Sequence, residues 1–149
     1  MAEAKEFIDN AQRSAAELVD RYFALWNEAD PERRRELIAG LWAEDGEQIL
    51  QATEEARSLA AGPGVGTSAV FEVRGHAELE ARVASAYDHW VASLGWSFRG
   101  RDDVDRVHDV IKFHWEAVDA DGEVTGVGLN FLVLTTEGLI QRDYSFVVG

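Results

Sequence analysis

The chain has 149 residues, of which 46% are hydrophobic, and its formal net charge is −14. This length and apolar content predict a single domain, residues 1–149, with one hydrophobic core. The negative charge repels phosphate backbones and anionic lipids, and no apolar run approaches the ~20 residues of a membrane span, so neither nucleic acid nor a membrane is expected as a partner. The chain has no cysteine, which excludes disulfides and cysteine-bound metals. Its charged amino terminus lacks the apolar core of a signal peptide, which predicts a cytoplasmic protein.

Two helices are predicted at the start of the chain. Apolar residues recur there with spacings of three and four, which predicts an amphipathic helix ending near Ala29. The stripe consists of Ala15, Leu18, Val19, Tyr22, Leu25 and Trp26. Asp30 is the predicted N-cap of a second helix, which begins at Pro31 and ends near Leu41. The arginines 33–35 are interpreted as a solvated face of this helix.

The middle of the chain carries weaker signals. Residues 48–58 fit either a strand or a helix, residues 61–66 form a glycine-rich loop, and residues 69–73 predict a short strand. A third helix is predicted after Gly75-His76 and ends near Gly95, with a stripe formed by Leu79, Val83, Ala86, Tyr87 and Trp90. Residues 96–99 predict another strand, which a charged turn follows.

Three strands are predicted at the end of the chain, over Val107–Val118, Thr125–Leu134 and Leu139–Val148. Both connections are four residues long and end in glycine, which is typical of hairpin turns. If each turn pairs its flanking residues symmetrically, Ile111 faces Asn130, and Asn130 faces Asp143.

Side-chain alternation then divides these strands into two different faces. Asp109, Asn130 and Asp143 fall on one face together with Ile111, Phe113 and Leu132. Two carboxylates and an amide are more than a purely structural sheet needs at such places. The other face is mainly apolar and consists of Val110, Leu129, Phe131, Val133, Ile140, Tyr144, Phe146 and Val148. A monomer rarely leaves such a patch in water, so this face predicts a homodimer.

Helices come before most of the sheet, an order that predicts the α+β class and disfavours a βαβ fold. Together with the strings at residues 19–27, 41–46 and 75–79 and the closing hairpins, this order resembles the nuclear-transport-factor-2-like (NTF2-like) superfamily, and within it the SnoaL-like branch. The resemblance implies a cone in which helices cover the concave face of a curved antiparallel sheet, enclose one pocket and leave the convex face for a dimer. Polyketide cyclases, ketosteroid isomerases, epoxide hydrolases and non-catalytic binding domains share this architecture.

Only some of the catalytic residues of ketosteroid isomerases have a counterpart in this sequence. Tyr22 stands where those enzymes have a tyrosine that donates to the developing enolate oxygen. Asn130 stands where they have a second oxyanion donor, and its amide can still donate. The expected aspartate base is replaced by Leu50, which cannot take a proton. A donor pair of Tyr22 and Asn130 is nevertheless able to polarise a carbonyl.

The comparison with epoxide hydrolases matches other residues. Those enzymes use two aspartates bridged by an arginine, and Asp109 and Asp143 match the aspartates, whereas Val107 replaces the arginine. Two carboxylates in a desolvated pocket push one pKa upward, which supplies an acid and a base from identical groups.

We therefore expect a small-molecule enzyme that performs cofactor-free acid/base chemistry, of the isomerase, cyclase or epoxide-hydrolase type, on an apolar, oxygen-bearing substrate. Asp143 and Asp109 would exchange protons, while Asn130 and Tyr22 hold the oxygen. No metal is expected, because the histidines lack ligand spacing. The expected pocket wall is Trp26, Trp42, Val83, Tyr87, Ile111, Phe113 and Leu132. The alternative is a non-catalytic domain that binds a small ligand or a partner, with Tyr22 a core tyrosine and Asp109 a strand-end residue.

Overall fold

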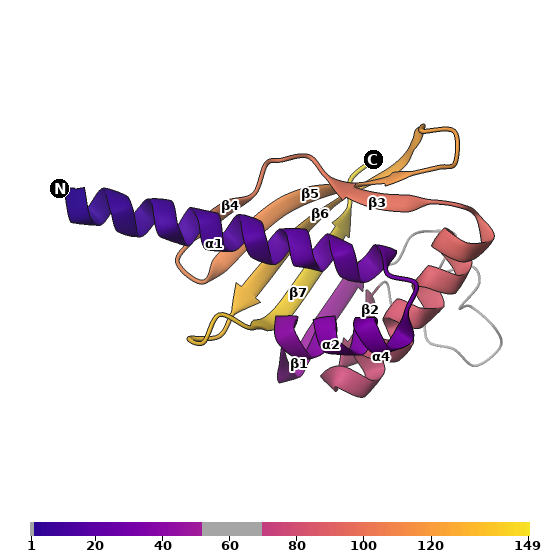
Figure 1. The fold of residues 1–149 in the computed structure, drawn as a ribbon, viewed down its shortest axis with the longest axis horizontal. Coiled ribbons are helices and arrows are strands. Elements are labelled where there is room, and N and C mark those ends of the chain that lie inside the picture. The colour runs from indigo at the N-terminus through magenta and orange to yellow at the C-terminus, as the bar shows by residue number, and fades with distance from the viewer. Residues whose placement is uncertain (1, 52–69) are drawn as a thin grey trace.

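The computed structural model describes residues 2–51 and 70–149. In these ranges, helices α1 (Ala2–Asn27), α2 (Pro31–Leu41) and α4 (Gly75–Ala86) pack on one face of a seven-stranded sheet (Figure 1), and a π-helix, η1 (Tyr87–Ser93), continues α4. The strands are β1 (Trp42–Gln51), β2 (Val70–Arg74), β3 (Ser97–Gly100), β4 (Asp105–Val107), β5 (Val110–Val118), β6 (Val124–Leu134) and β7 (Ile140–Val147). The predicted α+β cone is confirmed. The glycine-rich loop at 61–66, and most of the ambiguous segment 48–58, lie outside the described residues.

The strand order is β2-β1-β7-β6-β5-β3, and β4 also pairs with β5. All pairs are antiparallel except β1 and β7, which run parallel. The prediction of a wholly antiparallel sheet is therefore wrong at this pair. The hairpin signals that supported it apply only to strands adjacent in sequence, whereas β1 and β7 are the first and the last strand of the sheet in chain order.

Helix α1 buries the apolar stripe that the sequence predicted. All six stripe residues are buried, from Ala15 at 0% exposure to Trp26 at 9%. The helix begins earlier than its stripe, at Ala2, and its first turns project past the sheet in Figure 1 with Phe7 exposed. The apolar stripe therefore indicates which part of the helix packs, and does not indicate where the helix begins.

Helix α2 begins as predicted, since the Asp30 carboxylate accepts a hydrogen bond from the Glu32 amide at 3.0 Å. The interpretation of arginines 33–35 as a solvated face is wrong for Arg34, which is buried. Its guanidinium lies 5.1 Å from the centre of the Tyr87 ring, a cation–π contact that links α2 to η1.

Both closing hairpins shift the register by two residues relative to symmetric pairing. In each turn a glycine with φ of +85° ends a three-residue loop, and a bulge in the adjoining strands adds a second residue of offset. Asn130 therefore faces Phe113 and Ser145, so the predicted pairings with Ile111 and Asp143 are wrong. An offset of two keeps every side chain on its predicted face, because strand side chains alternate with a period of two.

The predicted strand from Val107 to Val118 is interrupted. His108 and Asp109 form a tight turn between β4 and β5, in which His108 has a φ of +51°. The bulge beside β7 also turns Ile140 into the core at 0% exposure, so its predicted place on the outer face is wrong. Phe131, Tyr144 and Phe146 do lie on that outer face, with the Phe131 and Phe146 rings in edge contact at 5.9 Å.

The main core fills the space between the helices and the inner face of the sheet. It joins the α1 stripe to Ile38 and Leu41 from α2, Leu79 and Val83 from α4, and inward residues of β5 to β7. No helix within the described ranges is long and apolar enough to cross a membrane. The polar residues described next lie inside this apolar core.

Candidate active site

Four polar side chains from different elements meet inside the core. The Tyr22 hydroxyl donates to Asp143 Oδ2 at 2.6 Å, and Gln48 Nε2 donates to the same oxygen at 3.2 Å. Asn130 Nδ2 donates to Asp143 Oδ1 at 2.8 Å and to the Tyr22 oxygen at 2.9 Å. Asp143 thus accepts three hydrogen bonds at 0% exposure, and it is the only fully buried carboxylate among the described residues.

The fold explains how these side chains meet. Tyr22 belongs to the buried stripe of α1, which crosses the inner face of the sheet. Asn130 and Asp143 point inward from β6 and β7, and the parallel pairing of β1 with β7 places Gln48 directly beside Asp143. Trp115 Nε1 and Ser145 Oγ each donate to Asn130 Oδ1 at 2.8 Å. These two bonds orient the amide of Asn130 so that its nitrogen faces Asp143 and Tyr22.

Burial dominates the electrostatics of this cluster. Desolvation raises the pKa of Asp143 from 3.8 to about 6, although the hydrogen bonds from Tyr22, Gln48 and Asn130 oppose the rise. Burial, together with the neighbouring Asp143 charge, raises the pKa of Tyr22 well above 10. A carboxyl with a pKa near 6 gains and loses its proton close to neutral pH, which suits a general acid or base.

A cavity of about 630 Å³ adjoins the cluster. Tyr22, Gln48 and Ser145 contribute polar groups to its wall, and Asp143 lies behind Tyr22 and Gln48, which both donate to it. Further polar or charged residues of the wall are Gln51, Glu72, Arg82 and Thr125. The apolar part is largely aromatic and includes Phe23, Trp26, Phe71, Trp90, Trp96, Phe98 and Trp115. This is the usual character of a small-molecule site, with a few polar groups in an apolar cavity of several hundred Å³.

The structure confirms the predicted inward positions of Tyr22, Asn130 and Asp143. Asp109 was expected beside them, and that placement is wrong. It is exposed in the turn between β4 and β5, where its backbone carbonyl accepts from the Leu134 amide at 2.8 Å. The strand pattern that placed Asp109 on the inner face does not extend through this turn.

Of the seven residues expected in the pocket wall, only Trp26 is found there. Tyr87 lies under Arg34, and the other five are core residues with exposures of 0 to 1%, namely Trp42, Val83, Ile111, Phe113 and Leu132. Trp42 and Phe113 still shape the site, because their rings pack 5.8 and 5.3 Å from the Tyr22 ring. The expectation placed the pocket too close to the middle of the sheet, which helix α1 covers.

Sequence reasoning missed several residues of the site. Gln48 fell in a segment of ambiguous pattern, and its position depends on the parallel β1–β7 pair. Arg82 lies in the predicted third helix between Leu79 and Val83, outside the predicted stripe, and no pattern in the sequence marked it. Trp90 carried a signal as a member of the predicted stripe, and it reaches the cavity from the π-helix, with its ring stacked on Trp96 at 4.7 Å.

Two buried polar atoms of wall residues lack a hydrogen-bond partner among the described residues. They are Trp26 Nε1, a donor, and Gln48 Oε1, an acceptor. Buried polar atoms are usually paired; these two are enclosed by the protein, with almost no surface open to the cavity. Within residues 2–51 and 70–149, no group of three or more acidic or histidine side chains could hold a metal ion.

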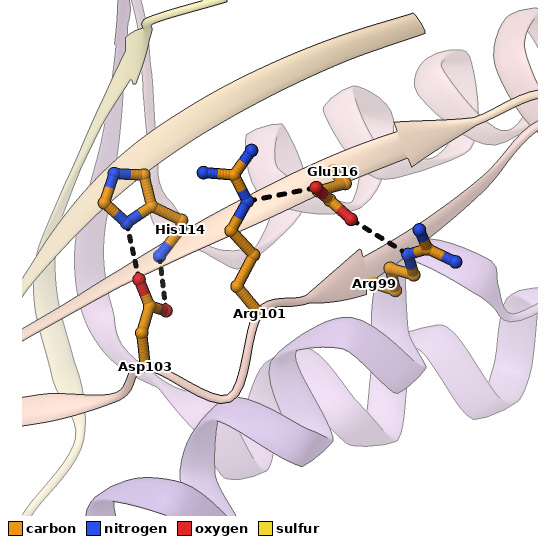
Figure 2. Close-up of polar contacts among 5 residues, drawn as sticks. All are labelled: Arg99, Arg101, Asp103, His114 and Glu116. Atoms are coloured by element: carbon orange, nitrogen blue, oxygen red, sulfur yellow. Dashed lines mark hydrogen bonds and ion pairs between the residues drawn. The ribbon is translucent and has the colours of Figure 1, made fainter. Parts of the chain in front are cut away.

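A second polar cluster lies on the other side of β5 (Figure 2). Arg99 and Arg101 both donate to the Glu116 carboxylate at 3.0 Å, and the Asp103 carboxylate contacts the backbone and ring nitrogens of His114. These residues attach β3 and the segment after it to β5. The cluster is largely exposed, where ion pairs contribute little energy, and it belongs to the outer surface of the sheet rather than to the cavity.

Comparison with solved structures identifies the fold. A candidate isomerase of the SnoaL-like family from Agrobacterium tumefaciens matches with a TM-score of 0.73 and 24% identity, covering 92% of this chain and 99% of the other. A SnoaL-like protein of unknown function from Burkholderia thailandensis matches with a TM-score of 0.61 and 15% identity, covering 93% of this chain and 98% of the other. A candidate polyketide cyclase from Sinorhizobium meliloti matches with a TM-score of 0.56 and 11% identity, covering 87% of this chain and 93% of the other.

No family model and no curated protein matches the sequence. The likeness to solved structures extends over most of the chain and includes proteins described as NTF2-like and ketosteroid isomerase-like. The chain therefore has the α+β cone fold of the NTF2-like proteins, and the Agrobacterium and Burkholderia structures, both described as SnoaL-like, match it with TM-scores above 0.6.

Proposed function

We propose that this protein is a small-molecule enzyme that performs acid/base chemistry without a cofactor on an apolar, oxygen-bearing substrate. The observation that carries the proposal is the buried Asp143 carboxyl, whose pKa is raised to about 6 behind the wall of an aromatic cavity. A buried charge costs free energy, and the apolar core around Asp143 does not need it for packing. Functional sites are where such costs are found.

Tyr22 connects the carboxyl to the cavity in the proposed mechanism. Tyr22 lines the cavity, and its hydroxyl donates to Asp143 Oδ2 at 2.6 Å. As a base, the tyrosine oxygen takes a proton from the substrate while its own proton passes to Asp143. As an acid, the same two transfers run in reverse. The tyrosine stays neutral overall, which agrees with its raised pKa, and Asp143 is the net proton acceptor or donor.

The neutral form of the site has a second use. When Asp143 is protonated it donates to the Tyr22 oxygen, which leaves the Tyr22 hydroxyl free to donate to a substrate oxygen. Gln48 Nε2, 3.4 Å from the Tyr22 oxygen, helps to hold that oxygen in place. Such donors in a water-poor site stabilise an oxygen that gains negative charge, as in enolisation of a ketone.

This arrangement favours isomerase or cyclase chemistry over epoxide hydrolysis. The epoxide-hydrolase comparison requires two carboxylates in one pocket, whereas Asp109 is exposed in a turn. Enolisation and ketonisation each need one group that moves a proton, and Asp143 acting through Tyr22 supplies it in either direction. Structural neighbours described as candidate isomerase and cyclase agree with this choice at the level of fold.

The alternative is a domain that binds a small ligand and does not turn it over. The observation in its favour is the complete burial of Asp143 and Asn130, at 0 and 1% exposure, which prevents direct contact with a ligand in this conformation. In that case the polar cluster only fixes α1 to the sheet, and Tyr22 Oη is an ordinary ligand contact.

Turnover by variants separates the two functions. Ketones, β-hydroxy carbonyl compounds and epoxides of about 10–20 carbons fit a cavity of this size and form the screen. Asp143→Asn should lower the rate on the substrate found by about 10²–10⁴, the usual value of a general acid or base, with little change in affinity. Asp109→Asn, which removes an exposed carboxyl, is the matched control and should keep full activity. If ligands bind and none is turned over, the binding function stands instead.

We also propose that the outer face of the sheet forms a homodimer. Phe131 and Tyr144 are only partly covered there, and Phe146 is 44% exposed. Together with Leu129 and Val133 they make an apolar surface next to the charged cluster, because Leu129 pairs with His114 of that cluster. A second copy of the chain would bury this surface.

A further inference from the structure

One charged side chain of the cavity has no part in the mechanism above. Arg82, from α4, lies in the cavity wall, partly buried, and its guanidinium carbon sits 5.6 Å from the centre of the Trp26 ring. Arginine stays protonated at neutral pH even where burial lowers its pKa, as it does here. The mainly aromatic cavity therefore contains a fixed positive charge.

Arg82 makes no ion pair and no hydrogen bond to any residue in the described part of the chain. Its attraction to Asp143 acts from beyond ion-pair distance. The contrast with neighbouring arginines is clear, since Arg35 pairs with Glu80 at 2.8 Å and Arg74 with Glu47 at 3.5 Å. The chain has 28 acidic residues against 14 basic ones, so carboxylates are plentiful. No carboxylate of the described residues lies within ion-pair distance of this partly desolvated guanidinium, which leaves it hydrogen-bonding capacity for a ligand.

We infer that Arg82 binds the carboxylate of a monoanionic ligand whose remaining part is an aromatic or polycyclic ring system. The planar guanidinium offers two parallel N–H groups that match the two oxygens of a carboxylate. The tryptophans of the wall provide flat apolar surfaces for the rings, among them Trp26, Trp90, Trp96 and Trp115. Arg82 is the one basic side chain among the described residues of the wall, which also contains the acidic Glu72, so a ligand with a single negative charge fits better than a more highly charged phosphate. This inference rests on the proposed function, because it names the substrate class of the same cavity.

Matched neutral and anionic probes test the inference. Naphthoic acid and its primary amide have the same shape and differ by one charge, and calorimetry measures the affinity of each at neutral pH. The wild-type protein should bind the acid about ten- to a hundredfold more tightly, the range expected for hydrogen bonds to a charged group. Arg82→Gln should remove this preference, and Arg82→Lys should retain part of it. Arg33→Gln, which deletes an exposed arginine of α2, is the control for net charge and should leave the preference intact.

Three results would overturn the inference: equal affinity of the wild type for both probes, no binding of either, or a preference that survives Arg82→Gln. The wild-type comparison decides the matter even if the Arg82 variants fail to fold. Asp143→Asn separates this inference from the proposed function, because it should abolish turnover and keep the preference for the acid. A preference for the acid without any turnover would leave the inference standing and remove the enzymatic function.

Discussion

Replacing Asp143 by asparagine should remove a defined part of the pH dependence of stability. Burial raises the pKa of Asp143 from 3.8 to about 6, so the folded protein holds this proton more tightly than the unfolded chain. The stabilisation is complete below the unfolded pKa and is lost as the pH rises through about 6. One pKa unit corresponds to about 1.4 kcal/mol, so the whole effect is about 3 kcal/mol.

Urea unfolding of the wild type and Asp143→Asn at two pH values measures this effect. The lower value is set at about pH 5, because the isoelectric point of about 4.5 favours association at lower pH. Between about pH 5 and pH 8, the free energy of unfolding of the wild type should fall by about 1 kcal/mol relative to the variant. The difference between the two proteins cancels the other titrating groups. Asp109→Asn, which changes an exposed carboxyl, should follow the wild type.

Parallel stability curves for the wild type and Asp143→Asn would refute this reasoning. They would mean that the carboxyl titrates alike in the folded and unfolded chain, and that its surroundings are not desolvated. A relative change of the opposite sign would mean that the hydrogen bonds from Tyr22, Gln48 and Asn130 outweigh burial, which would place the pKa below its ordinary value.

Two further predictions concern packing and assembly. Gly128→Ala should lower stability by about 1–3 kcal/mol, because the added Cβ would overlap the Trp115 ring. An unchanged melting temperature would contradict the close approach of β6 to Trp115 in the cavity wall. Phe146→Asp should convert the dimer to a monomer, as sedimentation would show, because it places a charge in the proposed interface. A wild-type protein that is monomeric at high micromolar concentration would refute the dimer.

The sequence was sufficient for features that depend on local periodicity. The α1 stripe placed Tyr22 in the core, and the Asp30-Pro31 pair located the start of α2. Alternation placed Asn130 and Asp143 on the inner face although both hairpin registers were off by two residues, because an even offset leaves the face unchanged. A single bulge without the turn offset would have reversed the assignment.

Features that depend on contacts between distant segments could not be read from these patterns. Gln48 joins the site only through the parallel pairing of β1 with β7, and no turn connects these strands. Asp109 followed the alternation of its predicted strand, but a turn without glycine or proline at His108-Asp109 ended that strand. Arg82 lies beside an apolar stripe, where a charge ordinarily points to solvent; the direction it takes depends on the shape of the cavity.

Hydrogen exchange on a bound ketone tests the proposed acid/base function most directly, because it needs no knowledge of the natural substrate. Tetralone is incubated with the protein in deuterium oxide near neutral pH, and mass spectrometry follows deuterium entering the carbon next to the carbonyl. The wild type should accelerate this exchange by about 10²–10⁴ over both Asp143→Asn and Tyr22→Phe, with Asp109→Asn equal to the wild type. Binding of the ketone without acceleration, or equal acceleration by Asp143→Asn, would contradict the role of Asp143 as the group that moves the proton.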